Sequence, residues 1–341
     1  EASSYLEDNF NLSSRLRMNL GLHFSTFQVQ KKNYFSVQPR ISARYQLSKD
    51  VVLKASYTKM SQYVHLISSM PFAMPTDLWV PVTSKIKPMQ AHQVSLGGYY
   101  TGIDGWEFSI EGYYKGMKNV LEYKDGVSFL GSSTGWEDKV EMGHGRSMGV
   151  EFMAQKTIGK TTGWLAYTLA KSDRKFAKGS INNGERFPYK YDRRHSINLT
   201  INHKFSDRID IGASWVFYTG GTSTIPEEKT TVIRPHNGAN NGFLWYGTYD
   251  NTNSSPTIGD VSYIEHRNNF RLPASHRLNL GVNFNKKTKH GMRTWNISLY
   301  NAYNAMNPAW VYRGHNKQGL SVIKKYTLLP LIPSFTYTYK F

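Results

Sequence analysis

The stretch Pro333-Ser334-Phe335-Thr336-Tyr337-Thr338-Tyr339-Lys340-Phe341 ends the chain and decides how the rest is interpreted. Aromatic side chains occupy every second position, and serine, threonine and lysine lie between them. Alternate side chains of a β-strand point to opposite faces, so this stretch predicts a strand with one aromatic face and one polar face. A soluble sheet seldom leaves an aromatic ladder at an unprotected chain end, because such an edge promotes aggregation.

Two architectures fit this last strand when it is taken alone. It can be the final strand of a soluble sandwich, or the final strand of a membrane barrel that turns its apolar side chains and aromatic girdles toward lipid. The remainder of the chain must decide between them.

The same alternation begins near residue 15 and recurs along the chain. In the first such segment the apolar residues take the even positions: Leu16, Met18, Leu20, Leu22 and Phe24. Alternation over about ten residues exceeds the usual strand of about five or six. About ten tilted residues is the length that crosses a bilayer. About fourteen such strands, without a helical pattern between them, predict one continuous meander.

The links between these strands differ in length. Tight turns alternate with long links at residues 61–88, 118–143, 171–194, 220–273 and 304–318. We take Leu320, Val322, Tyr326 and Leu328 as a barrel strand that reaches the last strand through a tight turn at 330–333. Short turns on one side and long loops on the other are typical of an outer-membrane barrel. A soluble sandwich has no reason to sort its loops in this way.

Composition narrows the function classes. The 341 residues include no cysteine and carry a formal net charge of +18. No run of eighteen apolar residues predicts a transmembrane helix. The basic residues are spread along the chain, and the aromatic residues take the lipid-facing parity, so we expect no nucleic acid partner. The predicted fold class is therefore all-β, an antiparallel transmembrane β-barrel that crosses the outer membrane of a Gram-negative cell many times.

Several motifs resemble a known family. The segment Tyr191-Asp192-Arg193-Arg194-His195 resembles the aromatic-Asp-x-x-His segment that opens a late strand in TonB-dependent outer-membrane receptors, and residues 166–172 look like the strand before it. Residues 275–282 and 295–308, with Asn307-Pro308 at the start of the last long loop, are similar to the closing section of that family.

The resemblance implies a larger protein. Such receptors have a barrel of about 22 strands, filled by an N-terminal plug domain that a TonB box precedes. This chain shows about fourteen strands and neither of those segments, and it begins at Glu1 without a signal peptide. We therefore expect residues 1–341 to be the C-terminal portion of a barrel domain without a plug domain. A smaller independent barrel is the alternative.

The resemblance implies TonB-dependent import of a scarce, bulky nutrient: siderophore, haem, cobalamin, glycan or peptide. The alternatives are a passive porin-like channel and a non-transport barrel subunit of an assembly, secretion or adhesion complex. Implied partners are outer-membrane lipid and lipopolysaccharide, whose phosphates attract basic residues, the TonB complex through the absent N-terminal region, and a surface lipoprotein.

Three groups of residues are candidates for function. If the apolar positions face lipid, the lumen-facing charges are Arg15, Arg17, Arg40, Arg44, Glu107 and Glu111. Exposed loop aromatics suit stacking on a bulky ligand, and the candidates are Trp79, Trp136, Trp245, Tyr246, Trp310 and Tyr312. The resemblance also implies that the barrel-insertion machinery reads the last strand through Phe335, Tyr337, Tyr339 and Phe341.

The sequence gives little support for catalysis. His195, Asp192 and Ser196 lie within one strand start, where neighbouring side chains point oppositely and cannot form a triad. The histidines lack the close spacing of metal ligands. We therefore expect no enzyme, and no catalytic, cofactor or metal residues.

Overall fold

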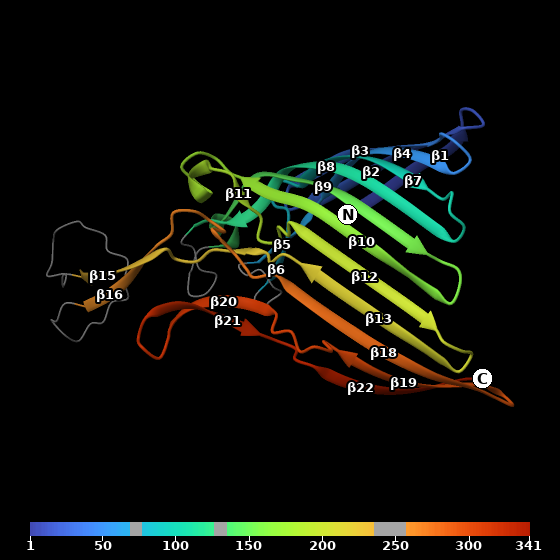
Figure 1. Cartoon of the computed structure of the whole chain (residues 1–341). Helices are drawn as coiled ribbons and strands as arrows, with labels where there is room; N and C mark the ends of the chain where they lie inside the picture. Colours follow the sequence, from blue (N-terminus) through green and yellow to red (C-terminus); the bar gives the residue numbers. More distant parts are fainter. Residues whose placement is uncertain (69–76, 126–134, 235–256) are drawn as a thin grey trace.

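The computed structural model describes residues 1–68, 77–125, 135–234 and 257–341. They form one large antiparallel sheet, four small two-stranded sheets and two short 3₁₀ helices. In Figure 1 the strands from β10 to β22 follow one another toward the bottom, and β1–β4 overlap β7–β9 in the upper part of the view.

The large sheet is one meander in chain order, as the alternation predicts. Its path contains β1 (Ala2–Asn11), β2 (Leu16–Val29), β3 (Lys32–Gln46), β4 (Val51–Gln62), β7 (Met89–Tyr100), β8 (Trp106–Tyr123), β9 (Val140–Lys156), β10 (Thr161–Lys175), β12 (His195–Lys204), β13 (Ile209–Tyr218), β18 (Ser275–Thr288), β19 (Gly291–Tyr300) and β22 (Ile332–Lys340). The short β11 (Phe187–Pro188) pairs with β10, which completes a 14-stranded sheet. The predicted all-β antiparallel architecture is confirmed.

The strand register places the apolar residues on one face. Leu20 lies opposite Ile41, and Ile41 lies opposite Tyr57. Tyr57 in turn lies opposite Val94. Because side chains alternate along each strand, one face of the sheet is an apolar surface, which we call the outer face. A strand shifted by one residue would turn its apolar set to the other face, so this surface fixes the register.

Long and short connections lie at opposite ends of the strands (Figure 1). Long connections carry the small sheets: β5 (Val64–Ile67) with β6 (Leu78–Pro81), β14 (Thr222–Ser223) with β17 (Phe270–Arg271), β15 (Glu228–Arg234) with β16 (Thr257–Tyr263), and β20 (Pro308–His315) with β21 (Ser321–Thr327). They also carry the 3₁₀ helices η1 (Trp136–Lys139) and η2 (Ile181–Gly184). We call this the loop end, and the opposite end the turn end.

One connection at the loop end is short. Strands β2 and β3 pair as far as Val29 and Lys32, and only Gln30 and Lys31 lie between them. Gln30 takes a positive φ of 53°, a conformation that tight hairpin turns require. This hairpin therefore forms a continuous ribbon where the neighbouring connections are long.

The prediction of a barrel strand at residues 320–328 is wrong. Strand β21 pairs with β20 in a separate hairpin, and β22 pairs directly with β19. Lys324 and Lys325 explain the difference, because adjacent residues face opposite ways and either lipid-facing parity would carry a lysine. The predicted turn at 330–333 is also wrong, since Ile332 and Pro333 already belong to β22. The C-terminus consequently lies at the turn end (Figure 1).

The buried apolar side chains gather near the loop end and not along the main sheet. One cluster contains Ile67, Val80, Ile86, Leu121, Tyr123 and Val140. A second contains Val120, Phe176, Ile181 and Phe187. The two clusters hold the loop segments against the loop-end parts of β8 and β9. No helix among the described residues is long and apolar enough to span a membrane.

The outer face generates a first prediction, made with the matched pair Leu20→Arg and Asn19→Arg. Near the bilayer midplane an arginine on the lipid face costs about 2–4 kcal/mol. Asn19 lies on the other face, where its amide donates to Glu7 at 2.6 Å and to Asn9 at 2.9 Å. An arginine there gains a carboxylate neighbour. Leu20→Arg should therefore reduce the yield of folded protein in membranes far more than Asn19→Arg. Equal yields from the two variants would contradict the assignment of faces.

Candidate functional site

The face opposite the apolar surface is polar, and we call it the inner face. Near the loop end its side chains form a buried hydrogen-bond network. The Gln38 amide donates to the Ser25 hydroxyl at 2.8 Å, and that hydroxyl also bonds the Tyr63 hydroxyl at 2.8 Å. Gln38 Oε1 accepts from the Ser61 backbone N–H at 3.1 Å. Such groups are stable away from bulk water only when they are paired.

The predicted lumen-facing charges share this inner face wherever they lie in strands. Arg40 and Arg44 have the same parity as Gln38 in β3, and Arg17 lies directly opposite Arg44. Glu107 and Glu111 share one parity of β8, where Glu107 lies opposite Gln155 and Glu111 lies opposite Glu151. Arg15 lies in the turn before β2, where it lines a cavity of about 560 Å³ together with Arg44. Whether these residues contact a passing ligand stays a prediction.

Three cations form a row across adjacent strands near the turn end, and we call them the basic row. Arg17 lies opposite Arg44, and Arg44 lies opposite Lys54. All three line one cavity of about 460 Å³ on the inner face. In the described part of the chain none of the three forms an ion pair. The row therefore carries positive charge that no carboxylate of these residues neutralises.

The carboxylates lie farther along the same wall. Glu111 of β8 lies directly opposite Glu151 of β9. Its carboxylate accepts a hydrogen bond from Tyr99 at 3.1 Å, and Lys54 Nζ lies 3.8 Å from the centre of the Tyr99 ring. Gly97 leaves room for this arrangement, because a Cβ there would lie 3.3 Å from Glu111 Oε2. The inner face thus carries the cations of the basic row on β2–β4 and the opposed carboxylates Glu111 and Glu151 on β8 and β9.

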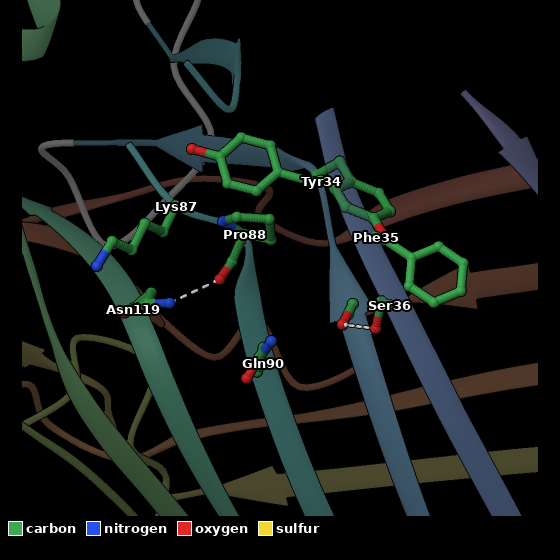
Figure 2. A pocket seen from close by; sticks show the side chains of 9 residues that line it. Tyr34, Phe35, Ser36, Lys87, Pro88, Gln90 and Asn119 are labelled. Atoms are coloured by element: carbon green, nitrogen blue, oxygen red, sulfur yellow. Dashed lines mark hydrogen bonds between the residues drawn. The ribbon is translucent and has the colours of Figure 1, made fainter. Parts of the chain in front are cut away.

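A smaller cavity lies nearer to the loop end (Figure 2). Its volume is about 170 Å³, and its lining includes Tyr34, Phe35, Lys87, Pro88 and Asn119. The Asn119 amide donates to the Pro88 carbonyl at 2.8 Å, as the dashed line shows. Pockets for drug-sized ligands measure about 300–1,000 Å³. This cavity is therefore too small for a bulky nutrient.

Asp192, the acidic residue of the aromatic-Asp-x-x-His segment, joins its own connection to β10 and to the connection between β13 and β18. Its side chain is fully buried and accepts from the Ser172 backbone N–H at 2.6 Å. Arg271 of β17 donates to its carboxylate at 2.5 Å and to its backbone carbonyl at 2.6 Å. The same guanidinium reaches the Gly220 carbonyl at 2.8 Å. We call this arrangement the Asp192 clamp; it fixes where the connection between β13 and β18 leaves the sheet.

A second arginine ties the same connection to β8, five strands away along the sheet path. Arg267 donates to the Glu122 carboxylate at 3.2 Å, the Tyr123 carbonyl at 2.7 Å and the Asp125 carboxylate at 3.0 Å. Arg174 of β10 approaches Glu122 from the other side at 2.6 Å. Charge-assisted bonds of this kind are stronger than neutral ones. Together they tie the connection between β13 and β18 to the loop end of β8, and β10 to the same carboxylate.

Burial changes the ionisation of two groups in this loop layer. It lowers the pKa of Lys190, against the opposing attraction of the Glu122 carboxylate. The Lys190 ammonium donates to the Ser68 carbonyl at 2.5 Å. Burial raises the pKa of the Tyr189 hydroxyl, whose ring lies 3.7 Å from the Arg174 guanidinium carbon. Both effects follow from the cost of placing charge away from water.

The candidate loop aromatics lie in different surroundings. Trp79 is 64% exposed and Tyr312 is 46% exposed. Trp136 packs against the apolar cluster that contains Ile67, and the Trp310 ring stacks on Tyr326 at 4.2 Å. Trp245 and Tyr246 lie outside the described residues. The described members come from three separate connections, and a shared ligand site made from them stays a prediction.

The aromatic residues of the last strand lie on the outer face. Tyr337 lies opposite Trp295, with ring centres 4.5 Å apart, and Phe335 lies 5.1 Å from the same indole. Tyr339 and Phe341 continue the row at 6.4 Å. Phe341 is fully exposed. No neighbouring strand within the described residues covers the other edge of β22.

The motif residues named above have separate partners. The Tyr167 hydroxyl bonds His195 Nδ1 at 3.0 Å, whereas Asp192 bonds Arg271 and Ser172. Among the residues that the structure describes, no group of three or more His, Cys, Asp and Glu side chains could hold a metal ion. Sequence reasoning did not find the arginine contacts to Asp192 and Glu122; the one available signal was the acidic residue within the Tyr191–His195 segment.

The Asp192 clamp generates a second prediction. Asp192→Asn keeps the shape of the side chain but removes the charge that Arg271 binds. Hydrogen bonds to charged groups contribute about 1.5–3 kcal/mol, which corresponds to a change of about tenfold to a hundredfold in local opening. Hydrogen exchange at the Ser172 amide, near the loop end of β10, should accelerate by that factor, while the other amides of the barrel strands stay protected. The control is Asp207→Asn, which removes an exposed ion pair with Lys204 in a tight turn. Unchanged exchange at Ser172 would show that the clamp does not hold the loops.

Comparisons with known proteins agree with this geometry. Solved structures that resemble the chain include the ferric-catecholate import receptor Fiu from E. coli, with a TM-score of 0.57 at 13% identity, covering 98% of this chain and 44% of that one. The ferric yersiniabactin uptake receptor FyuA from Yersinia pestis gives a TM-score of 0.59 at 13% identity and covers 99% and 45%. The pyoverdine receptor FpvA from Pseudomonas aeruginosa gives 0.59 at 12% identity and covers 99% and 42%. The chain thus spans less than half the length of these receptors.

The sequence itself matches none of the curated proteins with which it was compared. The family described as "TonB dependent receptor-like, beta-barrel" matches residues 1–305, which is most of the chain. The match includes the strands that carry the polar inner face, the apolar outer face and the Asp192 clamp. The chain therefore belongs to the TonB-dependent receptor β-barrel family.

Proposed function

We propose that this chain forms the C-terminal part of the barrel wall of an outer-membrane importer, which takes up a scarce, bulky nutrient with energy supplied through TonB. The observation that carries the proposal is the contrast between the two faces of the sheet. The apolar outer face suits lipid, whereas the inner face presents arginine, lysine and glutamate from the turn end toward the covered loop end. Charged residues in a membrane barrel mark a wet interior or a polar partner.

A ferric siderophore is the first cargo to test. Several receptors with a similar fold import or bind ferric chelates, among them those for ferric catecholate, ferripyoverdine and ferric yersiniabactin. The positive charge of the chain favours anionic cargo through electrostatic attraction. Haem, cobalamin, glycan and peptide are the further cargo classes. In this proposal exposed loop aromatics such as Trp79 and Tyr312 make the first contact with cargo, as aromatic side chains do at many binding surfaces.

The proposed position in the outer membrane implies three kinds of partner. Basic rim residues would pair with phosphates of lipopolysaccharide. TonB would act through an N-terminal region outside this sequence, and a surface lipoprotein would cover the loop end. One of the similar solved structures is a complex of FpvAI with pyocin S2, so a receptor of this fold can also bind a bacteriocin. A passive channel and a non-transport barrel are the rival functions.

The proposal predicts uptake that depends on both the receptor and TonB. Cells that produce the intact receptor should accumulate an iron-labelled ferric catecholate, ferric pyoverdine or another cargo from the classes above. Accumulation should fall to the level of receptor-deletion cells when TonB is removed. Uptake that persists without TonB would identify a passive channel. If no cargo class is taken up while the protein is folded at the surface, the non-transport function is favoured.

We further propose that the aromatic face of β22 is the assembly signal of the barrel. Deleting Phe341 removes one fully exposed ring and leaves the contacts of Trp295 with Phe335 and Tyr337 intact. A barrel that has already folded should lose little stability, because an exposed ring contributes little burial. The yield in outer membranes should fall several times more than the yield of refolding into lipid vesicles. A parallel fall of the two yields would show that Phe341 is a packing residue, and no change in either would show that it carries no signal.

A further inference from the structure

The outer face changes from apolar to basic where β8, β9 and β10 approach the loop end. Val150 of β9 lies opposite Leu169 of β10 within the apolar part. Six positions nearer to the loop end, the same two strands place His144 opposite Lys175. Lys118 of β8 lies opposite His144, and all three basic side chains are exposed. Because alternate residues of a strand share a face, this basic row belongs to the outer face.

Further cations surround these three side chains. Arg146 lies opposite Asp173 on the same face, and its Nε donates to that carboxylate at 2.9 Å. Arg186 reaches the same carboxylate from the connection after β10. Lys171 lies two positions before Asp173 and is exposed. We call the cations of this surface the outer basic patch: Lys118, His144, Arg146, Lys171, Lys175 and Arg186. Asp173 is buried and shared by two guanidiniums, so the patch keeps a net positive charge.

A glycine leaves a recess in the middle of the outer basic patch. Gly116 lies opposite Arg146, and a Cβ built on it would have one heavy atom of the described residues within 4 Å, a carbon of the Tyr114 ring at 3.7 Å. Tyr114 is 47% exposed and marks the apolar border of the patch, a position typical of interfacial aromatic residues. On the other side, Asn119 takes a positive φ of 59° in a bulge directly after Lys118. The recess therefore lies between an aromatic ring and a row of cations.

The position of the patch in the sheet decides what can cover it. Strands β8, β9 and β10 each have a neighbour on both sides, so no further strand pairs with them here. Residues that enter a barrel meet the inner face, and they cannot reach this surface. The apolar part of the same strands directly adjoins the patch. In a membrane, acyl chains would lie along that apolar part and headgroups would lie beside the cations.

The spacing of the cations indicates the size of the headgroup. Strands lie about 4.8 Å apart, and alternate residues of one strand lie about 6.8 Å apart, so the patch extends over at least about 10 Å. One phosphate cannot contact cations over that span, whereas a headgroup with two phosphates can. Guanidiniums bind phosphate through paired hydrogen bonds, and lysines add point charges.

We propose that the outer basic patch binds the diphosphorylated headgroup of a lipopolysaccharide molecule in the outer leaflet, with its acyl chains along the apolar part of β8, β9 and β10. The inference rests on the proposed position in the outer membrane and assigns particular residues to one lipid. The buried Asp173 carboxylate holds Arg146 and Arg186 in place at this site. Binding of the lipid needs neither cargo nor TonB, so it can be measured whether or not the receptor imports.

The test uses the intact receptor, purified in detergent and freed of bound lipid, with diphosphoryl lipid A, monophosphoryl lipid A and pyrophosphate as probes. Diphosphoryl lipid A should bind saturably, at least about tenfold more tightly than the monophosphoryl form, because one set of charge-assisted bonds is lost in the latter. Free pyrophosphate should not displace the lipid, because it lacks the acyl chains that the apolar surface contacts. Equal affinities for the two lipids, or displacement by an equal concentration of pyrophosphate, would overturn the proposal.

Paired variants locate the site. Changing Lys118→Gln together with Lys175→Gln should weaken binding of diphosphoryl lipid A by about tenfold or more. Changing both lysines to arginine should preserve binding, because the charge stays. The matched control, Lys49→Gln together with Lys160→Gln, removes two charges from tight turns at the turn end and should leave the affinity unchanged.

Folding of each paired variant is checked by its heat-sensitive electrophoretic mobility. Unchanged affinity in the folded glutamine variant of the patch would overturn the proposal. An equal loss in the control would also overturn it, by showing a general effect of charge. A receptor that binds the lipid at the patch but fails to take up any cargo would support the site while contradicting the import function.

Discussion

The structure depends on one constraint: within lipid every backbone N–H and C=O must be hydrogen-bonded by the chain itself. A long antiparallel meander meets this requirement from strand to strand, from β1 to β22. The two-residue period of the strands then separates lipid from water, because each strand can present apolar side chains only on alternate positions. The apolar row through Leu20 and the polar row through Gln38 are two results of that single geometry. The outer edges of β1 and β22 are the places where the described residues leave this requirement open.

A sheet of this kind has no room for an apolar core between two layers, and the molecule places its buried apolar clusters near the loop end instead. The loops are then fixed by buried ions. Asp192 and Glu122 each bind two arginines. Leaving a buried carboxylate without its partner costs free energy. The main effect of these contacts is therefore to select one arrangement of the loops, and not to raise the stability of the fold. Ion pairs therefore fix the arrangement of the loop end, whereas the alternation of apolar and polar residues fixes the strands of the large sheet.

The parts of the fold that follow from local periodicity could be predicted from the sequence. Residues 16–24 alternate so regularly that both the strand and its lipid-facing side follow directly. Residues 320–328 alternate except at Ile323 and Lys324, and β21 lies in a loop hairpin while β22 pairs directly with β19. The contacts of Arg267 with Glu122 join residues that are 145 positions apart. No local pattern encodes such a pair, so the ionic organisation of the loops could not be found in advance. The inward parity of Arg17 and Arg44 was accessible, whereas their alignment in one row required the register.

The Asp192 clamp has a consequence for how such a protein can diversify. Arg271 fixes the base of the connection between β13 and β18 by binding Asp192 and the Gly220 carbonyl. The residues between β15 and β16 lie beyond that fixed base along the chain. Changes of length or composition there are separated from the membrane strands by an anchor that does not involve them. Insertion or exchange of residues there therefore requires no new strand pairing in the large sheet.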